Sequence, residues 1–209
     1  MRVSTLVLVT SAAIRSAVGA AVGGNAVDPI NGYEMVDMSW AIEVAPGRVE
    51  ILNGTVQEVV AQATEINPGF LTDELLAFPP AFPPAPAPAP AGKRRLLQRR
   101  TVKSCNSESR YADGFAIIEG VNYLRRVPGK PTLGPGPGEC ARVSCSKDSA
   151  IYWCNNSTDV KTVTWEAVAN SAKYITDVCP WYGPDHPSFV SGQNSEDGKW
   201  NTVVRGDTC

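Results

Sequence analysis

Between residues 37 and 70 the hydrophobic positions first alternate with polar ones and then recur at helical spacing. WAIEV (residues 40–44) and VEIL (residues 49–52) alternate on either side of a Pro-Gly-Arg turn, which predicts a small hairpin. Thr55 and Glu58 have the pattern of a capping box. The helix that follows would bury Val56, Val59, Val60, Ala63 and Ile66, and Asn67-Pro68-Gly69 ends it. The pattern predicts a strand, strand, helix unit that is too small to be very stable alone.

The second half of the chain shows two further helical patterns and several short strand patterns. One helix is predicted over residues 112–126 and another over residues 164–178. ARVSC (residues 141–145) and SAIYWC (residues 149–154) predict two strands joined by a short turn. A final strand is predicted over residues 199–206, with a short strand over residues 188–191 as an option. The apolar faces of the helices would be Phe115, Ile118, Val121 and Leu124 in the first and Trp165, Val168, Ala172 and Ile175 in the second.

This order of elements predicts the fold class. Helix, hairpin, helix and strand in succession favour an antiparallel sheet covered on one face by two helices. We therefore expect an α+β protein, a small α/β sandwich that is preceded by a small ββα segment.

The first 20 residues have the pattern of a secretory signal peptide. Arg2 precedes an apolar stretch over residues 3–14, and Val18 and Ala20 occupy the small-residue positions of a cleavage site. Arg15 interrupts that stretch well short of the roughly 20 residues that span a bilayer. No later segment is apolar enough for a stable membrane anchor. We therefore expect a secreted, extracellular protein.

Alternating Pro and Ala over residues 78–91 lead into the basic stretch GKRRLLQRR (residues 92–100). Proline removes backbone donors and restrains the preceding residue, so the run predicts an extended spacer. Exposed, flexible segments are where proteases cut most readily. The basic pairs resemble the sites of kexin-type processing proteases, and their residues are Lys93, Arg94, Arg95, Arg99 and Arg100. The alternative is a basic linker that is only solvated.

All the cysteines follow the basic stretch. An even set in one half of a secreted chain predicts a disulfide framework, for which the sequence leaves 15 pairings open. Zinc is disfavoured because the chain has no C-x-x-C pair and its single histidine is His186. We expect no metal and no cofactor. The six cysteines are Cys105, Cys140, Cys145, Cys154, Cys179 and Cys209.

Charge divides the chain at the same place. Residues 21–92 hold nine acidic residues and one basic residue, whereas residues 101–209 hold twelve acidic and eleven basic residues. The near balance gives the second half no field that would steer it to nucleic acid or to an anionic membrane. We divide the chain into a signal peptide (1–20), an acidic pro-segment (21–77), a Pro/Ala-rich linker with dibasic sites (78–100) and a mature six-cysteine domain (101–209).

Three sequence stretches resemble a family of small secreted fungal proteins. They are CARVSCSKDSAIYWCNN, the helix WEAVANSAKYITDVC and GKWNTVVRGDTC, and the pro-segment motif NGTVQEVVAQATEINPGF with the dibasic junction is similar to the same group. More remotely, element order and cysteine richness resemble the killer-toxin-like superfamily of effectors and toxins. The resemblance implies a toxin-like or effector-like protein that acts on another cell. It transfers no functional residue, and the cysteine number and long pro-region depart from the toxins, which counts against ion-channel inhibition.

Enzymatic chemistry has weak support. There is no G-x-S-x-G motif, and His186 lies in a Pro-flanked loop. Glu139, Arg142 and His186 would serve a ribonuclease only if the fold brought them together. Glu119 with Glu166 is an arbitrary carboxylate pair for glycoside hydrolysis. We therefore predict no catalytic residue and favour a protein that is not an enzyme.

Trp181 and Tyr182 are the candidate binding residues. They follow a cysteine in a Pro/Gly-containing loop, where core packing explains aromatic residues less well than recognition does. The tripeptide Arg205-Gly206-Asp207 spells a cell-adhesion motif but is more typical of a turn at the end of a strand. Sequons make Asn53, Asn155 and Asn156 candidate glycosylation sites, which should lie on the surface.

These observations favour a secreted non-enzymatic effector or toxin-like protein that dibasic cleavage releases and that binds an extracellular protein or carbohydrate. The pro-segment would assist folding or mask the mature surface. The alternatives are a small secreted hydrolase of RNA or cell-wall carbohydrate and a cell-wall carbohydrate-binding protein.

Overall fold

The computed structural model describes residues 30, 32–70, 101–106, 110–183 and 186–209. The expected signal peptide, the Pro/Ala-rich linker and the five basic residues of the processing sites lie outside these residues. The described parts form an α+β protein with three disulfides, as predicted. No helix in them combines the length and apolarity that crossing a bilayer requires.

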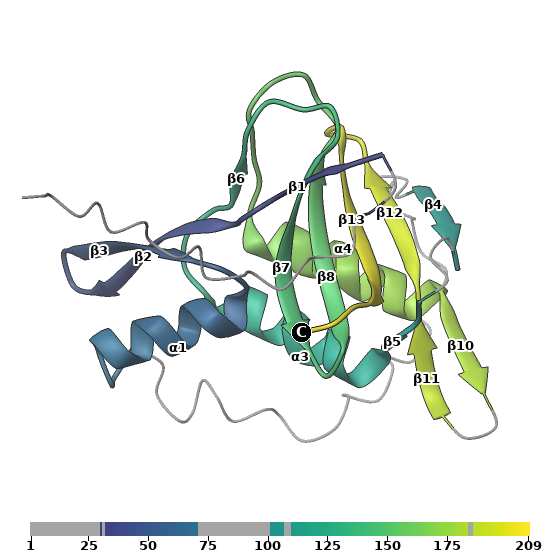
Figure 1. Cartoon of the computed structure of the whole chain (residues 1–209), viewed down its shortest axis with the longest axis horizontal. Coiled ribbons are helices and arrows are strands. Elements are labelled where there is room, and N and C mark those ends of the chain that lie inside the picture. Colours follow the sequence, from purple (N-terminus) through teal and green to yellow (C-terminus); the bar gives the residue numbers. More distant parts are fainter. Residues whose placement is uncertain (1–29, 31, 71–100, 107–109, 184–185) are drawn as a thin grey trace, which may run out of the picture.

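A six-stranded sheet runs through the middle of the molecule (Figure 1). Its order is β1-β7-β8-β13-β12-β4. All neighbours pair antiparallel except β1, which joins the edge parallel to β7, so the sheet is mixed. The strands are β1 (Glu34–Val36), β4 (Thr101–Cys105), β7 (Glu139–Ser146), β8 (Ser149–Asn155), β12 (Gly192–Glu196) and β13 (Trp200–Gly206).

Two helices, α3 (Gly114–Arg126) and α4 (Trp165–Val178), pack against each other and against this sheet (Figure 1). The predicted face of α4 is correct, because Trp165, Val168, Ala172 and Ile175 are all buried. The face of α3 was only partly predicted: Val121 and Leu124 are buried, whereas Phe115 is 51% exposed.

The reason for the different face is a close approach at Gly120. A Cβ added to Gly120 would lie 2.3 Å from Ser144 Oγ of β7, so only glycine lets α3 approach the sheet this closely. With Gly120 against the sheet, Ala116, Ile117 and Leu124 point into the core and Phe115 points out.

The segment before the linker forms the predicted hairpin and helix, β2 (Ser39–Ala45), β3 (Arg48–Asn53) and α1 (Val56–Ile66). Glu58 Oε2 accepts a hydrogen bond from the backbone N of Thr55 at 2.7 Å, as the capping box requires. We call residues 30 and 32–70, which also include β1, the N-terminal unit. The buried apolar residues of its hairpin and of α1 belong to the same cluster as those of α3, α4 and the sheet.

Two smaller sheets complete the described fold. β10 (Pro180–Gly183), β11 (His186–Val190) and β5 (Ala112–Asp113) form one, and β6 (Thr132–Leu133) pairs with β9 (Lys161–Thr162) in the other. Of these strands, the sequence pattern indicated only a part of β11.

All six cysteines are paired, as Cys105–Cys179, Cys140–Cys154 and Cys145–Cys209. Cys140, Cys154 and Cys145 of the second and third bridges lie in a separate buried cluster with Tyr152 and Val203. Tyr152 and Val203 alternate along their strands with residues of the larger cluster, so these bridges stabilise the sheet face opposite the helices.

The N-cap of α3 offers a first test of the fold. Asp113 Oδ1 accepts hydrogen bonds from the backbone N of Phe115 at 2.7 Å and of Ala116 at 3.2 Å. We expect Asp113→Ala to lower the free energy of unfolding by about 1 kcal/mol. Asp113→Asn should lower it much less, because the asparagine side chain keeps an acceptor oxygen. Urea unfolding of both variants measures this. No loss of stability in Asp113→Ala would show that the cap adds little, and equal losses in both variants would contradict the role of the acceptor oxygen.

Candidate functional site

An exposed cluster of three aromatic rings lies on the small sheet formed by β10, β11 and β5. Trp181 of β10 stands opposite Phe189 of β11, with ring centroids 6.0 Å apart. Tyr111, next to β5, lies 5.7 Å from Trp181 and 6.4 Å from Phe189. Trp181 is 46% exposed and Tyr111 39% exposed. We call these three residues the aromatic platform.

Two contacts fix the platform to the main fold. Trp181 follows Cys179 by two residues, and Cys179 is bridged to Cys105 at the end of β4. On the other side, the backbone N of Gly206 donates to Arg110 O at 3.1 Å. A Cβ on Gly206 would lie 2.5 Å from Tyr111 O, so glycine allows β13 to approach the platform's backbone. The rings are therefore held on ordered strands.

The platform presents apolar ring surface to solvent. Tilted, half-exposed aromatic rings stack on sugar rings or enter pockets of a protein partner, and they lose little conformational entropy when they bind. Phe115, on the first turn of α3 directly after β5, is 51% exposed and adds apolar surface close in the chain to Tyr111.

The sequence predicted only part of this surface. Trp181 is exposed as expected, whereas Tyr182 lies in β10 with a side chain outside what the structure describes. Tyr111 and Phe189 were missed, because nothing local shows that the segments before α3 and after β10 become neighbours. Phe115 was assigned to the core; the small residues Gly114 and Gly120 were the signal for a different helix face.

A buried polar cluster holds the end of the chain against β7 and β8. The Tyr152 hydroxyl donates a short hydrogen bond to Asp207 Oδ2. Arg142 Nη1 lies 3.3 Å from the same oxygen and also donates to Thr208 O at 2.9 Å. Burial, and then the hydrogen bond to Asp207, raise the pKa of Tyr152 well above its usual range. The cluster therefore holds a proton firmly on Tyr152.

The tripeptide Arg205-Gly206-Asp207 belongs to this buried region. Arg205 is 3% and Asp207 5% exposed. An adhesion motif must present its Arg and Asp side chains to a receptor. Both are buried here, so the tripeptide is part of the packed interior.

Two of the groups that a ribonuclease would need, Glu139 and Arg142, do not converge. Glu139 and Arg142 lie three positions apart before the bulge in β7, so they point to opposite faces of the sheet. His186 lies in β11, and its side chain is outside what the structure describes. Glu119 binds Lys147 at 2.9 Å, and Glu166 is exposed on the first turn of α4. Within the described residues no three His, Cys, Asp or Glu side chains form a group that could hold a metal ion.

The three sequon asparagines differ in accessibility. Asn53 is exposed and Asn156 is half-buried. Asn155 is fully buried, and its Nδ2 donates to Gly134 O and Asp159 O, so the expectation of a surface position is wrong for Asn155. A glycan on that nitrogen would break both hydrogen bonds.

Comparison of the chain with protein-family models, with curated proteins and with solved structures finds no match.

The buried cluster predicts how stability depends on alkaline pH. Tyrosine in the unfolded chain ionises near pH 10, whereas folded Tyr152 keeps its proton, so its contribution to stability is present below about pH 10 and is lost as pH rises further. Tyr152→Phe should lower the free energy of unfolding by about 1 to 3 kcal/mol at pH 7, because buried Asp207 loses a hydrogen-bond donor. Above pH 10 the free energy of unfolding of the variant should also fall less steeply with pH than that of the unaltered protein. The difference in slope should be up to about 1.4 kcal/mol per pH unit.

Denaturant unfolding of both proteins from pH 7 to pH 11 measures this. Lys147, whose pKa is raised by its hydrogen bond to Glu119, contributes to both proteins and cancels in the difference. Parallel curves would show that Tyr152 ionises normally.

Proposed function

We propose that the chain is the precursor of a secreted, non-enzymatic effector or toxin-like protein that binds a target on another cell. The observation that carries the proposal is the aromatic platform, where Trp181 and Tyr111 stay exposed although a buried core lies beside them. Exposed tryptophan and tyrosine are the residues most enriched at the energetic centre of binding sites. The target is an extracellular protein or carbohydrate.

The disulfide framework supports this proposal. Three bridges within 109 residues of sequence, residues 101–209, are typical of small secreted domains that act outside cells. The finer likeness to the α/β sandwich of killer-toxin-like proteins, and with it a fungal source, belongs to the same proposal. Its support is the order of α3, the β7–β8 hairpin, α4 and β13, with Cys209 bridged.

A hydrolase has less support. Glu119 binds Lys147, and Arg142 binds Asp207 and lies on the opposite sheet face from Glu139. A protein that binds the producer's own cell-wall carbohydrate would use the same platform, so the binding experiment below covers it.

Processing by a kexin-type protease at Lys93, Arg94, Arg95, Arg99 or Arg100 is part of the proposed function. In the precursor, the platform lies at one end of the long axis, and the β2–β3 hairpin and α1 lie at the other (Figure 1). The N-terminal unit therefore leaves the platform uncovered. We propose that this unit assists folding rather than masking the binding surface.

The central test is binding by Trp181→Ala. We expect labelled variant to bind target cells at least about tenfold more weakly than the unaltered protein, because a central aromatic anchor contributes about 2 kcal/mol or more. Val160→Ala is the matched control: Val160 is 60% exposed and lies outside the platform. Equal binding by both variants would exclude the platform as the target surface.

The same assay separates the target classes. Competition by a soluble cell-wall polysaccharide would identify a carbohydrate target, and loss of binding after protease treatment of the cells would identify a protein.

Intact mass and N-terminal sequence of the secreted product test the processing step. We expect a polypeptide that starts at Thr101 and carries three closed disulfides under denaturing conditions. Replacing the five basic residues by serine should leave the chain whole. A product that still starts near Ala21 in a host with a kexin-type protease would contradict the precursor model.

A further inference from the structure

The N-terminal unit contacts both faces and one edge of the main sheet. On the helix side, its apolar residues share one buried cluster with α3 and α4. On the opposite side, Ile30 belongs to the cluster of Cys140, Cys154 and Val203, with Tyr33 and Met35 packed against it. Between the two faces, β1 extends the sheet. The unit therefore contacts the cysteine-containing domain on both faces of the sheet and along the edge strand β7.

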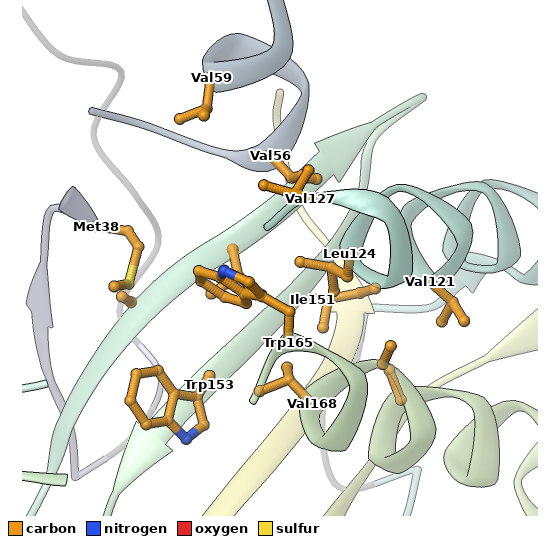
Figure 2. Packing of buried hydrophobic residues seen from close by; sticks show 14 of the residues in the cluster. Met38, Val56, Val59, Val121, Leu124, Val127, Ile151, Trp153, Trp165 and Val168 are labelled. Carbon is orange, nitrogen blue, oxygen red and sulfur yellow. The ribbon is translucent and has the colours of Figure 1, made fainter. Parts of the chain in front are cut away.

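The tightest contact on the helix side joins two tryptophans. Trp40 of β2 stacks on Trp165 of α4 with ring centroids 3.7 Å apart and planes 18° apart. Trp40 is 2% exposed, and its Nε1 donates to Gly54 O at 2.7 Å. Figure 2 shows Met38, Val56 and Val59 of the N-terminal unit in the same cluster as Leu124, Val127 and Trp165. Without the unit, this part of the core would face water.

Gln57 of α1 completes the edge of β7 where the ladder with β1 ends. β1 pairs with β7 only as far as Val36 and Ala141. Beyond that point, Gln57 Oε1 accepts from the backbone N of Cys145 at 3.2 Å, and Gln57 Nε2 donates to Ser144 Oγ at 2.8 Å. A side-chain amide thus supplies a partner to backbone that would otherwise be an open sheet edge.

Polar contacts continue on the face away from the helices. The Tyr33 hydroxyl donates to Asn201 Oδ1 at 3.2 Å and accepts from Gln193 Nε2 at 3.3 Å. The backbone N of Glu34 donates to Gly138 O at 2.6 Å. The Tyr33 contacts reach strands β13 and β12, two and three positions beyond β7 in the sheet.

No covalent bond crosses this contact once the linker is cut. The three disulfides all join cysteines within residues 105–209, and all six cysteines are used. Whether the two pieces stay together therefore depends on non-covalent contacts alone.

We propose that the N-terminal unit stays bound after cleavage in residues 93–100, so that the working form of the protein is a heterodimer of two chains from one precursor. The surface that binds it is formed by the edge of β7, Trp165 with the ends of α3 and α4, and the Tyr33 contacts on the opposite face. Its partner is this chain's own residues 30–70. This goes beyond the proposed target binding and does not depend on it.

The experiment uses the full chain with the recognition sequence of an added protease in place of residues 93–100. Denaturing electrophoresis verifies that cutting is complete. Native mass spectrometry and size exclusion should then give one species with the mass of the uncut chain plus one water, which separates into two only in denaturant. Two species in native buffer, with the cysteine-containing piece alone, would overturn the proposal. The added protease makes the result independent of whether a natural kexin-type protease cuts the chain.

Two variants of the same chain locate the contact. Trp40→Ala and Gln57→Ala should each increase dissociation of the cut protein about tenfold or more, because they remove the stacked ring and the edge partner. Ile51→Ala, at a position of β3 that is 64% exposed, is the control and should stay associated. If Trp40→Ala fails to fold, Gln57→Ala still decides the question. Equal retention by Gln57→Ala and Ile51→Ala would contradict the proposed edge contact.

Discussion

The stacking of Trp40 on Trp165 is the contact on which the architecture depends, because it joins two parts of the chain separated by the linker into one core. A small unit of two strands and a helix cannot bury enough apolar surface on its own. It becomes stable by placing its apolar face on α3 and α4 and its first strand on the edge of β7. The reverse also holds, since the cysteine-containing domain would otherwise expose an unpaired strand edge and a tryptophan.

The hydrophobic core and two of the disulfides stabilise opposite faces of the main sheet. The helices protect one face of the sheet with apolar side chains. The opposite face carries two bridges and the buried Arg142, Tyr152 and Asp207 cluster, which ties the last residues to β7 and β8. The remaining bridge, Cys105–Cys179, lies at the far edge, where it fixes the end of α4 beside the aromatic platform. Rigid support therefore reaches the surface that we assign to recognition.

Local elements could be predicted from the sequence, whereas their long-range pairing could not. Alternation predicts the hairpin, and capping and helical spacing predict α1 and α4. Each of these signals lies within a short stretch of consecutive residues. The parallel pairing of β1 with β7 joins segments that are far apart in sequence, and three residues of β1 carry no periodic signal of their own. Trp181 was recognisable because it follows a cysteine in a Pro/Gly context. Its neighbours are Tyr111, directly before β5, and Phe189 in β11, and only the tertiary fold brings the three rings together.

The acidic N-terminal unit and the aromatic platform lie apart, so charge is unevenly distributed over the described residues. Residues 32–70 carry Glu34, Asp37, Glu43, Glu50, Glu58 and Glu65 against Arg48 alone, while residues 101–209 are close to neutral. Most of this negative charge belongs to the hairpin and α1, at the end of the long axis away from β10 and β11 (Figure 1). Cell surfaces are commonly anionic, and their field extends about 8 Å at physiological ionic strength. At such a surface residues 32–70 are repelled, whereas the nearly neutral part that carries the aromatic rings is not.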